Sequence, residues 1–497
     1  MGRQEVAPAT HEDGFGRSRQ LVERLIGWLG DAPAAALTHA ELEDRLSAQV
    51  REAVRQLYQD HLDLRAQREQ AFKAVASATG AVHGAVEVGH ERSLATVFGE
   101  VRVRRIAYRA RGHANLCPAD AALNLPEERY SHGLRRMAAE EASRGSFDEA
   151  AAAIGRASGQ HVPKRQVEEL TRRSAVDFET FYDHAKRAET AGPDVVVISA
   201  DGKGIVMRPA ALRPVTAARA RSKKLATRLS KGETRYRKRM AEVGAVYDVV
   251  PVPRAPEDVM GSGELAAPVA KAKWLTASVV DDAVHVLSMV FDEADRRDPG
   301  HQGTWVALVD GANYQISRIK AEAKARNVEV TIICDFVHVL EYIWKAAWSF
   351  FDEGDPGAEA WVKQKALEVL RSKAATVAAA IRRKATCMGL GPKERANADT
   401  CADYLLHKAP YLDYANALQK GWPIATGVIE GACRHIVKDR MDITGARWGL
   451  DGAEAVLKLR ALRSNGDFPS YWAYHLAQER HRVHESRYAN GVLPAAA

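Results

Sequence analysis

Apolar residues recur at every third or fourth position through most of the first ninety residues. This is the period of a helix that buries one face. The pattern is clearest over residues 18–30 and 36–72. We therefore predict a helical N-terminal region over residues 1–90. The sequence leaves its role open between dimerisation, DNA binding and coverage of the core.

Residues 93–108 instead alternate apolar and basic side chains about a turn at Gly99-Glu100. Alternation with a period of two predicts a β-hairpin with one wet, positively charged face. Such a face could contact phosphate, but a solvated sheet edge carries the same pattern. We favour the solvated edge.

A pair of helices follows the hairpin. Ser146 and Glu149 have the spacing of a capping box that begins the first helix. A Ser-Gly-Gln turn then leads to a second helix whose surface is basic, with Lys164 and Arg165 in its first turn. The outline fits a helix-turn-helix that enters a DNA major groove, and it fits an αα-hairpin equally well. With the β-hairpin, it makes residues 91–190 a candidate DNA-binding region.

From residue 190 the pattern becomes rich in strands. Three β-branched runs come first and alternating helices and strands follow, at 194–201, 243–252, 273–282, 283–297, 304–311, 313–326 and 328–335. The order βββαβαβ predicts an α/β fold, a mixed five-stranded sheet flanked by helices in the layout of an RNase H-like domain. We assign residues 191–338 to the first part of this core, 339–420 to a helical insertion, and 421–497 to the last part of the core with C-terminal helices.

Two aspartates interrupt the buried strands of this core. The first run stops at Asp201 and the fourth at Asp310, and a glycine follows each. The first and fourth strands of an RNase H-like sheet are neighbours, so both carboxylates would reach one patch of solvent. Hard oxygen ligands at such a place suit Mg²⁺, and a pair of ions can hold both reacting oxygens of a phosphodiester.

A third carboxylate lies far downstream. Glu430 begins a predicted helix, and Arg434 shares its face four residues later, where it could reach a phosphate. The competing interpretation is local: Asp-Gly is a common turn signal, and a glutamate is stabilised near any helix N-terminus. Because three carboxylates occupy the expected positions together, we favour a metal site.

Composition limits the compartment and the class of protein. The chain has 497 residues, a net charge of +7 and 46% hydrophobic residues, which fits an ordinary globular protein of several domains. Its five cysteines are scattered without a CxxC pair, so we expect a reducing cytoplasm and no disulfide framework. We find no apolar leader segment and no membrane-spanning run, and we expect neither export nor membrane insertion.

The densest charge lies just after Asp201. Residues 208–239 contain twelve Lys or Arg and one Glu, which predicts a basic insertion over 208–240 that phosphates would order. A solvated arm is the alternative, and DNA contact is favoured because the segment begins beside the proposed metal site. The candidate DNA-binding residues here are Lys203, Arg219, Arg221, Lys223, Lys224, Arg228, Lys231, Arg235, Arg237, Lys238 and Arg239.

Long stretches of the chain resemble a known family. They are "DGKGIVMRPAALR", "LATRLSKGETRYRKRMAEVGAVYD", "WVALVDG", "CDFVHVLEYIWKAAW" and "GWPIATGVIEGACRHIVKDRMDITGARWGLDGAEAVLKLRALRSNGDF". Over nearly its whole length the chain resembles DDE transposases of bacterial insertion sequences, most closely the ISKra-type group. The resemblance implies an RNase H-like core whose metal-binding triad is Asp201, Asp310 and Glu430, and binding to the terminal inverted repeats of the element.

The related Mutator-like transposases carry a C/D-x-x-H motif after the fifth strand. Here Asp335 and His338 match it. Asp335 is the main rival of Asp310 as second carboxylate, and His338 either orients a water, phosphate or carboxylate, or is a structural residue. Further along, Trp448 beside Arg447 is a candidate base or phosphate contact.

The implied reaction uses Mg²⁺, or Mn²⁺, as two ions per active site. Water first cuts the element ends, and the freed 3′-hydroxyl then attacks target DNA. Since two ends must be joined, a homodimer or larger homo-oligomer on the nucleoid is expected. The alternatives are an RNase H-like DNA nuclease without strand transfer and a catalytically silent, transposase-derived DNA-binding protein.

Overall fold

The computed structural model describes residues 14–184, 194–222, 237–261 and 266–494. The chain forms two compact units. Unit 1 consists of Met1–Phe181 and Pro469–Ala497, and unit 2 of Tyr182–Phe468. The chain therefore leaves unit 1 once and returns to it once. Residues 469–497, the end of the region predicted to hold the last part of the core and the C-terminal helices, belong to unit 1.

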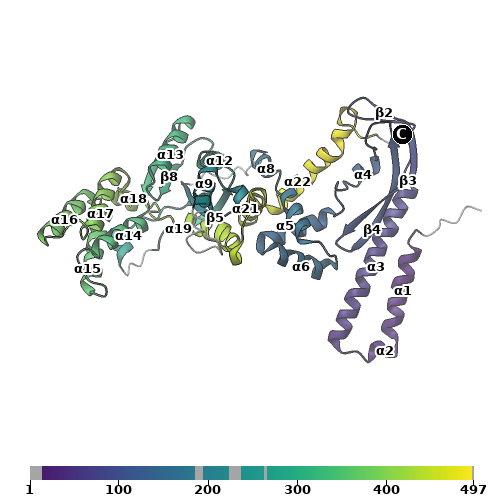
Figure 1. Ribbon diagram of the computed structural model, residues 1–497, viewed down its shortest axis with the longest axis horizontal. Helices are drawn as coiled ribbons and strands as arrows, with labels where there is room; N and C mark the ends of the chain where they lie inside the picture. The colour runs from purple at the N-terminus through teal and green to yellow at the C-terminus, as the bar shows by residue number, and fades with distance from the viewer. Residues whose placement is uncertain (1–13, 185–193, 223–236, 262–265, 495–497) are drawn as a thin grey trace, which may run out of the picture. The chain divides into compact units, whose positions relative to one another are not determined.

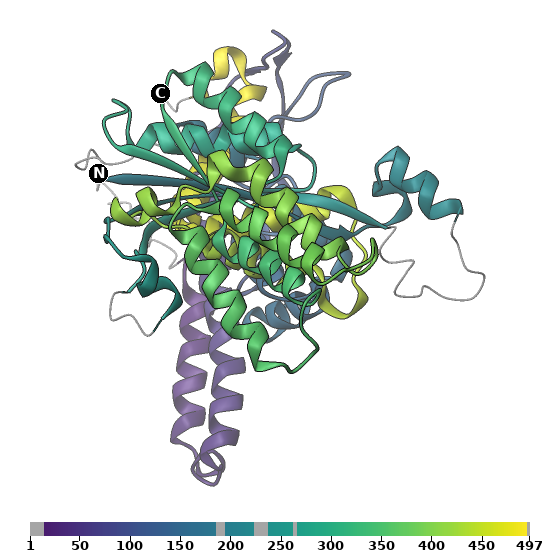
Figure 2. The same cartoon turned by 90° about the vertical axis from the view of Figure 1, so that its left-hand side faces the viewer.

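Unit 1 begins with the predicted helices. Helices α1 (Gly16–Gly30) and α3 (His39–Gln67) lie side by side, and the short α2 (Ala32–Ala35) joins them (Figures 1 and 2). A capping box starts α3, in which Thr38 and Glu41 satisfy each other's backbone amides. The hairpin is fixed at its base by Ser18, whose hydroxyl donates to Asp60 at 2.6 Å.

The predicted β-hairpin is present, with a different turn. Strands β3 (Ala85–Thr96) and β4 (Gly99–Arg109) pair in an antiparallel register that matches Thr96 with Gly99. The turn is therefore at residues 97 and 98, two residues before the expected Gly99-Glu100, and the Thr96 hydroxyl closes it by donating to the Gly99 carbonyl at 2.7 Å. Two short strands, β1 (Val75–Ala76) and β2 (Val82–His83), pair nearby in the sequence.

The rest of unit 1 is helical. Its elements are α4 (Pro118–Ala122), α5 (His132–Arg144), α6 (Phe147–Ser158), α7 (Lys164–Arg173) and the part of α22 (Phe468–Val483) from Pro469 onward. The predicted Ser146 and Glu149 capping box begins α6. Helices α5, α6 and α7 share a small core that includes Leu134, Ile154 and Val167. The chain passes into unit 2 within α8 (Phe178–His184).

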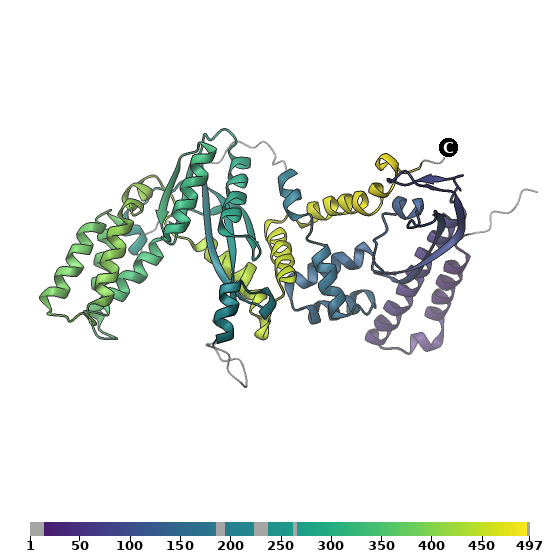
Figure 3. The same cartoon turned by 45° about the horizontal axis from the view of Figure 1, so that its top comes forward.

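Unit 2 is built on a five-stranded mixed sheet (Figures 1 and 3). Its strands are β5 (Val195–Val206), β6 (Lys238–Val249), β7 (Ala270–Ser278), β8 (Thr304–Val309) and β9 (Val330–Cys334), in the order β7-β6-β5-β8-β9. Strand β6 pairs antiparallel with both β5 and β7. Strand β8 pairs parallel with both β5 and β9. The first and fourth strands of the unit, β5 and β8, are neighbours as predicted.

Helices flank the sheet. The predicted helices are α12 (Ala283–Arg297) and α13 (Asn313–Arg326), and α12 lies against β5, β6 and β7. Gly244 in β6 permits this close packing, since a Cβ there would lie 2.4 Å from Val290 of α12. Two further helices of the core are α9 (Pro214–Ser222), after β5, and α11 (Pro256–Met260), after β6.

The predicted helical insertion separates β9 from the last part of the core. It contains α14 (Phe336–Ala347), α15 (Pro356–Leu370), α16 (Ala374–Cys387), α17 (Ala396–Lys408) and α18 (Tyr414–Gln419), drawn in green in Figure 1. Then follow α19 (Gly427–Ala432), a π-helical turn (Cys433–Lys438), α20 (Asp439–Met441) and α21 (Leu450–Asn465). Throughout the described residues, every helix is too short or too polar to cross a bilayer.

Candidate active site

Asp201 does not end its strand, contrary to the sequence expectation. Strand β5 continues to Val206 because its whole length pairs with β6, where Asp201 lies opposite Val243. On its other side β5 pairs with β8 only over residues 195–199. Asp201 is therefore just past the point where β8 stops. Beyond Ser199 the backbone edge of β5 on that side is not paired with β8.

The carboxylate of Asp201 contacts a helix from the far end of unit 2. One oxygen accepts from the Gly202 amide at 2.6 Å, and the other accepts from the Cys433 thiol at 3.4 Å. Burial, and then the negative charge of Asp201, raise the pKa of Cys433, so this thiol stays protonated and remains a donor. Cys433 directly follows α19, and this contact holds α19 against β5.

Asp310 directly follows β8 and is exposed. Its side chain accepts from the Ala312 amide at 2.8 Å in a tight turn. Gly311 has a φ of +98°, and a Cβ there would lie 2.8 Å from the hydroxyl of Tyr404. That hydroxyl donates to the Asp310 carbonyl at 3.2 Å. The glycine after Asp310 is thus required both by its backbone conformation and by the approach of insertion helix α17.

Glu430 is exposed on α19. The Thr426 hydroxyl, one helical turn earlier, lies 3.2 Å from one of its oxygens. The same hydroxyl lies 2.8 Å from an oxygen of Asp335. Since a hydroxyl has one proton, Thr426 can donate to only one of these two carboxylates at a time.

Asp335 is buried and its oxygens are occupied. It caps α14 by accepting from the Val337 amide at 3.1 Å, and it also accepts from the amide and hydroxyl of Thr426. Its own amide donates to the Val309 carbonyl at 2.7 Å. These bonds give Asp335 a positioning role: it ties the residue before Asp310 to the residue that begins α19.

The hydrogen bonds thus connect all three candidate carboxylates. Asp310 is joined to Glu430 through Val309, Asp335 and Thr426, and Asp201 is joined to the same helix through Cys433. Asp201, Asp310 and Glu430 nonetheless do not form a set whose ligand oxygens all lie within 4.8 Å of one another. At least one pair is therefore too wide for direct binding of a single Mg²⁺, whose opposite ligands are about 4.2 Å apart.

His338 lies on α14, three residues after Asp335, and it is partly exposed. Its ring packs edge-on against Tyr342 and Tyr404, at centroid distances of 5.3 and 6.1 Å, and the two tyrosines stack on each other at 4.2 Å. Its Nδ1 lies 3.9 Å from Glu341. His338 therefore belongs to an aromatic cluster between α14 and α17. Within this cluster, Tyr404 contacts Asp310 through the hydrogen bond from its hydroxyl to the Asp310 carbonyl.

One acidic neighbour escaped the sequence analysis. Glu242 on β6 lies opposite Gly202, and burial together with the nearby charge of Asp201 raises its pKa. The sequence does not predict that Glu242 is partly buried on a strand, because charged and apolar residues are mixed around it. Its proximity to Asp201 makes it a further source of negative potential at this edge.

The predicted DNA-binding residues have different surroundings. Lys203, Arg219, Arg221 and Lys238 are exposed, and Arg237 is partly buried. Lys223, Lys224, Arg228, Lys231 and Arg235 lie outside the described residues. Arg239 differs from the expectation. Its guanidinium donates to the carbonyls of Val279 at 2.7 Å, Val280 at 3.3 Å and Ala211 at 3.4 Å, so it ties loops together instead of facing a ligand.

Trp448 also differs from the expectation. Its side chain is 5% exposed, its indole N–H donates to the Met441 carbonyl at 3.0 Å, and Arg440 covers the ring. Backbone bonds to Val206 and Arg208 hold it against the end of β5. Trp448 is thus a core residue that cannot contact a base, whereas its neighbour Arg447 is exposed.

Arg434, four residues after Glu430, is 79% exposed and has only a long 3.9 Å contact with Asp439 among the interactions of the described chain.

In unit 1, Lys164 forms an ion pair with Asp148 of the preceding helix, and Arg165 is exposed. Both residues of the second helix therefore lie at the surface.

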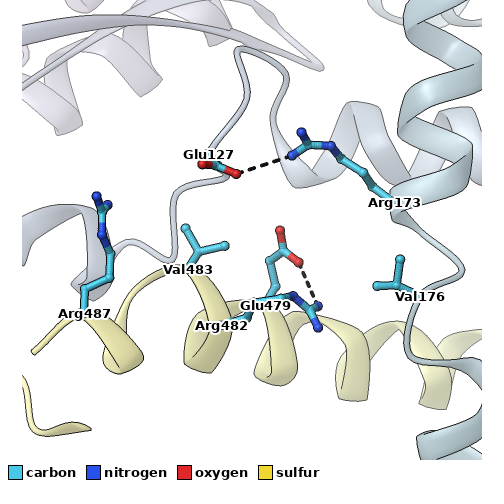
Figure 4. A pocket seen from close by; sticks show the side chains of 7 residues that line it. All are labelled: Glu127, Arg173, Val176, Glu479, Arg482, Val483 and Arg487. Carbon is cyan, nitrogen blue, oxygen red and sulfur yellow. Dashed lines mark hydrogen bonds and ion pairs between the residues drawn. The ribbon is translucent and has the colours of Figure 1, made fainter. Parts of the chain in front are cut away.

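Unit 1 contains a second gathering of charged groups. Arg135 is fully buried, and its guanidinium contacts Glu128 and Glu479, the latter at 3.0 Å. The buried His475 donates from Nδ1 to Asp177 at 2.7 Å and accepts from Arg135 at 3.3 Å. Figure 4 shows the adjoining cavity of about 370 Å³, lined by Glu127, Arg173, Val176, Glu479, Arg482, Val483 and Arg487. Its two glutamates pair with Arg173 and Arg482.

No protein-family model matches the sequence, and no curated protein is significantly similar to it. Among solved structures, the chain matches the Drosophila P element transposase strand transfer complex with 10% sequence identity and a TM-score of 0.23. The match covers 69% of this chain and 79% of that one. A score this low does not establish a shared fold.

Proposed function

We propose that the chain is a DDE-type DNA transposase of the insertion-sequence class. In this proposal unit 2 is an RNase H-like catalytic core and Asp201, Asp310 and Glu430 are its catalytic carboxylates. The chain binds the terminal inverted repeats of its element, cuts the DNA strands there and transfers them to a target. The strand order β7-β6-β5-β8-β9 supports this proposal, because it places β5 and β8 together.

The observation that carries the proposal is the contact between Cys433 and Asp201. These residues are 232 positions apart, and their contact holds the helix with Glu430 against the strand with Asp201. A second connection, through Thr426 and Asp335, leads from Glu430 to the end of β8. Turn capping explains a carboxylate at one place, but it does not explain why three separate segments are joined around three of them.

The donor set fits a hard divalent cation. All three side chains offer carboxylate oxygens, and within the described residues one oxygen each of Asp310 and Glu430 has no hydrogen-bond donor. The spread of the three carboxylates exceeds the ligand sphere of one ion, and together they would be the residues that hold a pair of ions. When bound, Mg²⁺ or Mn²⁺ would stabilise negative charge on the attacking and leaving oxygens of a phosphodiester.

The other residues of the chain then bind and orient DNA. Lys203 and Arg434 lie close in sequence to Asp201 and Glu430 and are exposed, so each can pair with a phosphate beside the scissile bond. Arg219 and Arg221 on α9 extend the basic surface. Lys164 and Arg165 would make the equivalent contacts if α6 and α7 act as a helix-turn-helix.

A supercoiled plasmid carrying the element ends tests the proposal. Protein with Mg²⁺ or Mn²⁺ should nick the ends and yield a joined product. Asp201→Asn, Asp310→Asn and Glu430→Gln should each abolish both products while retaining DNA binding. Glu359→Gln, an exposed glutamate on α15, is the matched control and should cut normally.

The same gel separates the alternatives. Nicking without joined product indicates a nuclease, and a mobility shift without nicking indicates a DNA-binding protein without catalysis. Either result overturns the proposed strand transfer. Undiminished cutting by Glu430→Gln would remove the third carboxylate from the mechanism.

A further inference from the structure

The helical hairpin of unit 1 has one apolar face that nothing in the described chain covers. Helices α1 and α3 run antiparallel, and the end that carries α2 stands clear of the rest of the unit (Figures 1 and 2). Between Arg19 and Val50, Ala34 alone is buried. A pair of helices buries little apolar surface by itself, so a partner on this face would stabilise the hairpin.

The exposed apolar residues have coiled-coil spacing on both helices. On α1 they are Val22, Ile26 and Leu29, at i, i+4 and i+7. On α3 the same spacing recurs at Val50, Val54 and Leu57. Ile26 is 64% exposed, four others are between 37% and 42% exposed, and Val54 is partly buried. This spacing produces a continuous stripe on each helix.

Both stripes lie on the same face of the hairpin. Successive residues of a helix are about 100° apart around its axis. On each helix the stripe therefore lies roughly 90° around the axis from the side that faces the other helix. The rotation has the same sense on both helices when each is followed from its N-terminus. Because the helices are antiparallel, equal turns bring both stripes to one side. The Ser18–Asp60 hydrogen bond fixes how the two antiparallel helices are aligned along their axes. In this alignment Val22 lies at the height of Leu57, and Leu29 at the height of Val50.

The other faces of the hairpin are accounted for. The back of α3 packs on the body of unit 1, where Gln59 accepts from the Arg102 amide at 2.8 Å. The free face opposite the stripes is polar, with Gln20 and Arg24 on α1 and Arg45 and Glu52 on α3. An apolar face opposite a polar one marks a binding surface more clearly than scattered exposed residues do.

We propose that this face binds the same face of a second copy, so that two hairpins form a four-helix bundle. The charges of the hairpin favour this occupant. Helix α1 has three arginines and one glutamate, whereas α3 has six acidic residues and four arginines. A two-fold arrangement lays α1 of one copy across α3 of the other, which pairs the basic helix with the acidic one.

The size of the face sets the strength of the dimer. Helix α1 is about 22 Å long and the pair is about 20 Å wide, a footprint of roughly 450 Å². This is less than the roughly 800 Å² per partner of a standard stable interface. The hairpin therefore gives a reversible dimer with a dissociation constant in the micromolar range.

Sedimentation velocity on the full chain, without DNA or metal, tests the inference between about 0.2 and 50 µM. The wild type should change from monomer to dimer over this range. Ile26→Glu with Val50→Glu should weaken the dimer at least about 100-fold, because it places four charges in one small interface. Gln20→Glu with Ala48→Glu adds the same charge to the face opposite the stripes and should dimerise like the wild type.

A wild type that stays monomeric throughout overturns the inference, as does a dimer that the Ile26→Glu and Val50→Glu changes leave intact. If that variant loses helicity, hydrogen exchange of the wild type decides instead. Amides of α1 should exchange more slowly at 50 µM than at 0.2 µM, and equal rates contradict the hairpin interface. None of these measurements involves catalysis, so the proposed function can fail while this inference stands.

Discussion

The Arg135 network of unit 1 and the candidate carboxylates of unit 2 use charge in opposite ways. In the network the charged groups satisfy one another: Arg135 contacts Glu128 and Glu479, and Arg482 donates to both oxygens of Asp177 at 3.0 Å. In unit 2, Asp310 and Glu430 are exposed, and each has an oxygen without a donor in the described chain. Removing one member of a saturated buried network destabilises a fold, whereas exposed carboxylates with free oxygens are available to a cation and a substrate.

The largest expected effect separates activity from stability at the unsaturated site. Asp310→Asn should lower the rate of DNA cleavage at least about 10⁴-fold, or more than about 5 kcal/mol in the activation free energy, because one anionic ligand is lost. The melting temperature should stay within about 2 °C of the wild type. A large loss of stability together with activity would show that Asp310 is a structural turn residue.

The saturated network should respond in the opposite manner. Arg135→Ala leaves the carboxylates of Glu128 and Glu479 without their buried partner and should cost about 3–5 kcal/mol of stability. Hydrogen exchange of α5 and α22 peptides in increasing urea measures this loss in unit 1. Arg136→Ala, on the exposed side of the same helix, should cost less than about 0.5 kcal/mol. Equal effects of the two changes would contradict a structural role for the network.

Acid should weaken unit 1 through His132. Burial, and then the charge of Arg135, lower the pKa of His132 to about 4. The unfolded chain therefore takes up this proton more readily than the folded one, and stability falls as the pH drops from about 6.5 to 4. The loss should be about 3 kcal/mol. His132→Gln should flatten this part of the pH profile, and His61→Gln on α3 should leave it unchanged.

The smallest predicted effect concerns Thr426, which contacts both the buried Asp335 and the exposed Glu430. Thr426→Val removes the hydroxyl between Asp335 and Glu430 while keeping the shape of the side chain. Cleavage should fall about tenfold because Glu430 is less well oriented, and stability should fall by about 1 kcal/mol because Asp335 loses one donor. Thr386→Val, an exposed threonine of α16, is the control. Unchanged cleavage by Thr426→Val would mean that Glu430 is oriented by other contacts.

The sequence predicts most of the sheet because local patterns determine it. Runs of β-branched residues indicate β5, β8 and β9. A predicted helix precedes β8 and another lies between β8 and β9, which favours parallel pairing of these strands. The turn after Asp310 is also local, since a glycine is needed at Gly311. The local pattern predicts the end of β5 too early because "DGKG" is a turn signal, whereas its extended conformation depends on pairing with β6, more than thirty residues later.

The contacts that complete the candidate site could not be predicted in the same way. Thr426 and Asp335 are 91 residues apart, and no local pattern shows that their side chains meet. Arginine and glycine around Trp448 favour a ligand contact in the sequence, but its backbone partner is Met207, which directly follows β5 and is distant in the sequence. Long-range packing decided each of these positions.

Unit 1 is assembled from two separate pieces of the chain, since α22 contributes His475 and Glu479 to a network begun by Arg135 and Asp177. Residues 182–468 must emerge from the ribosome between these pieces, which takes roughly 15 to 60 s at ordinary rates of translation. During that time Arg135 has no Glu479 beside it, and the early helices wait with an incomplete interior. A nascent chain halted before α22 should therefore be a substrate for chaperones and proteases, however well its central unit has already folded.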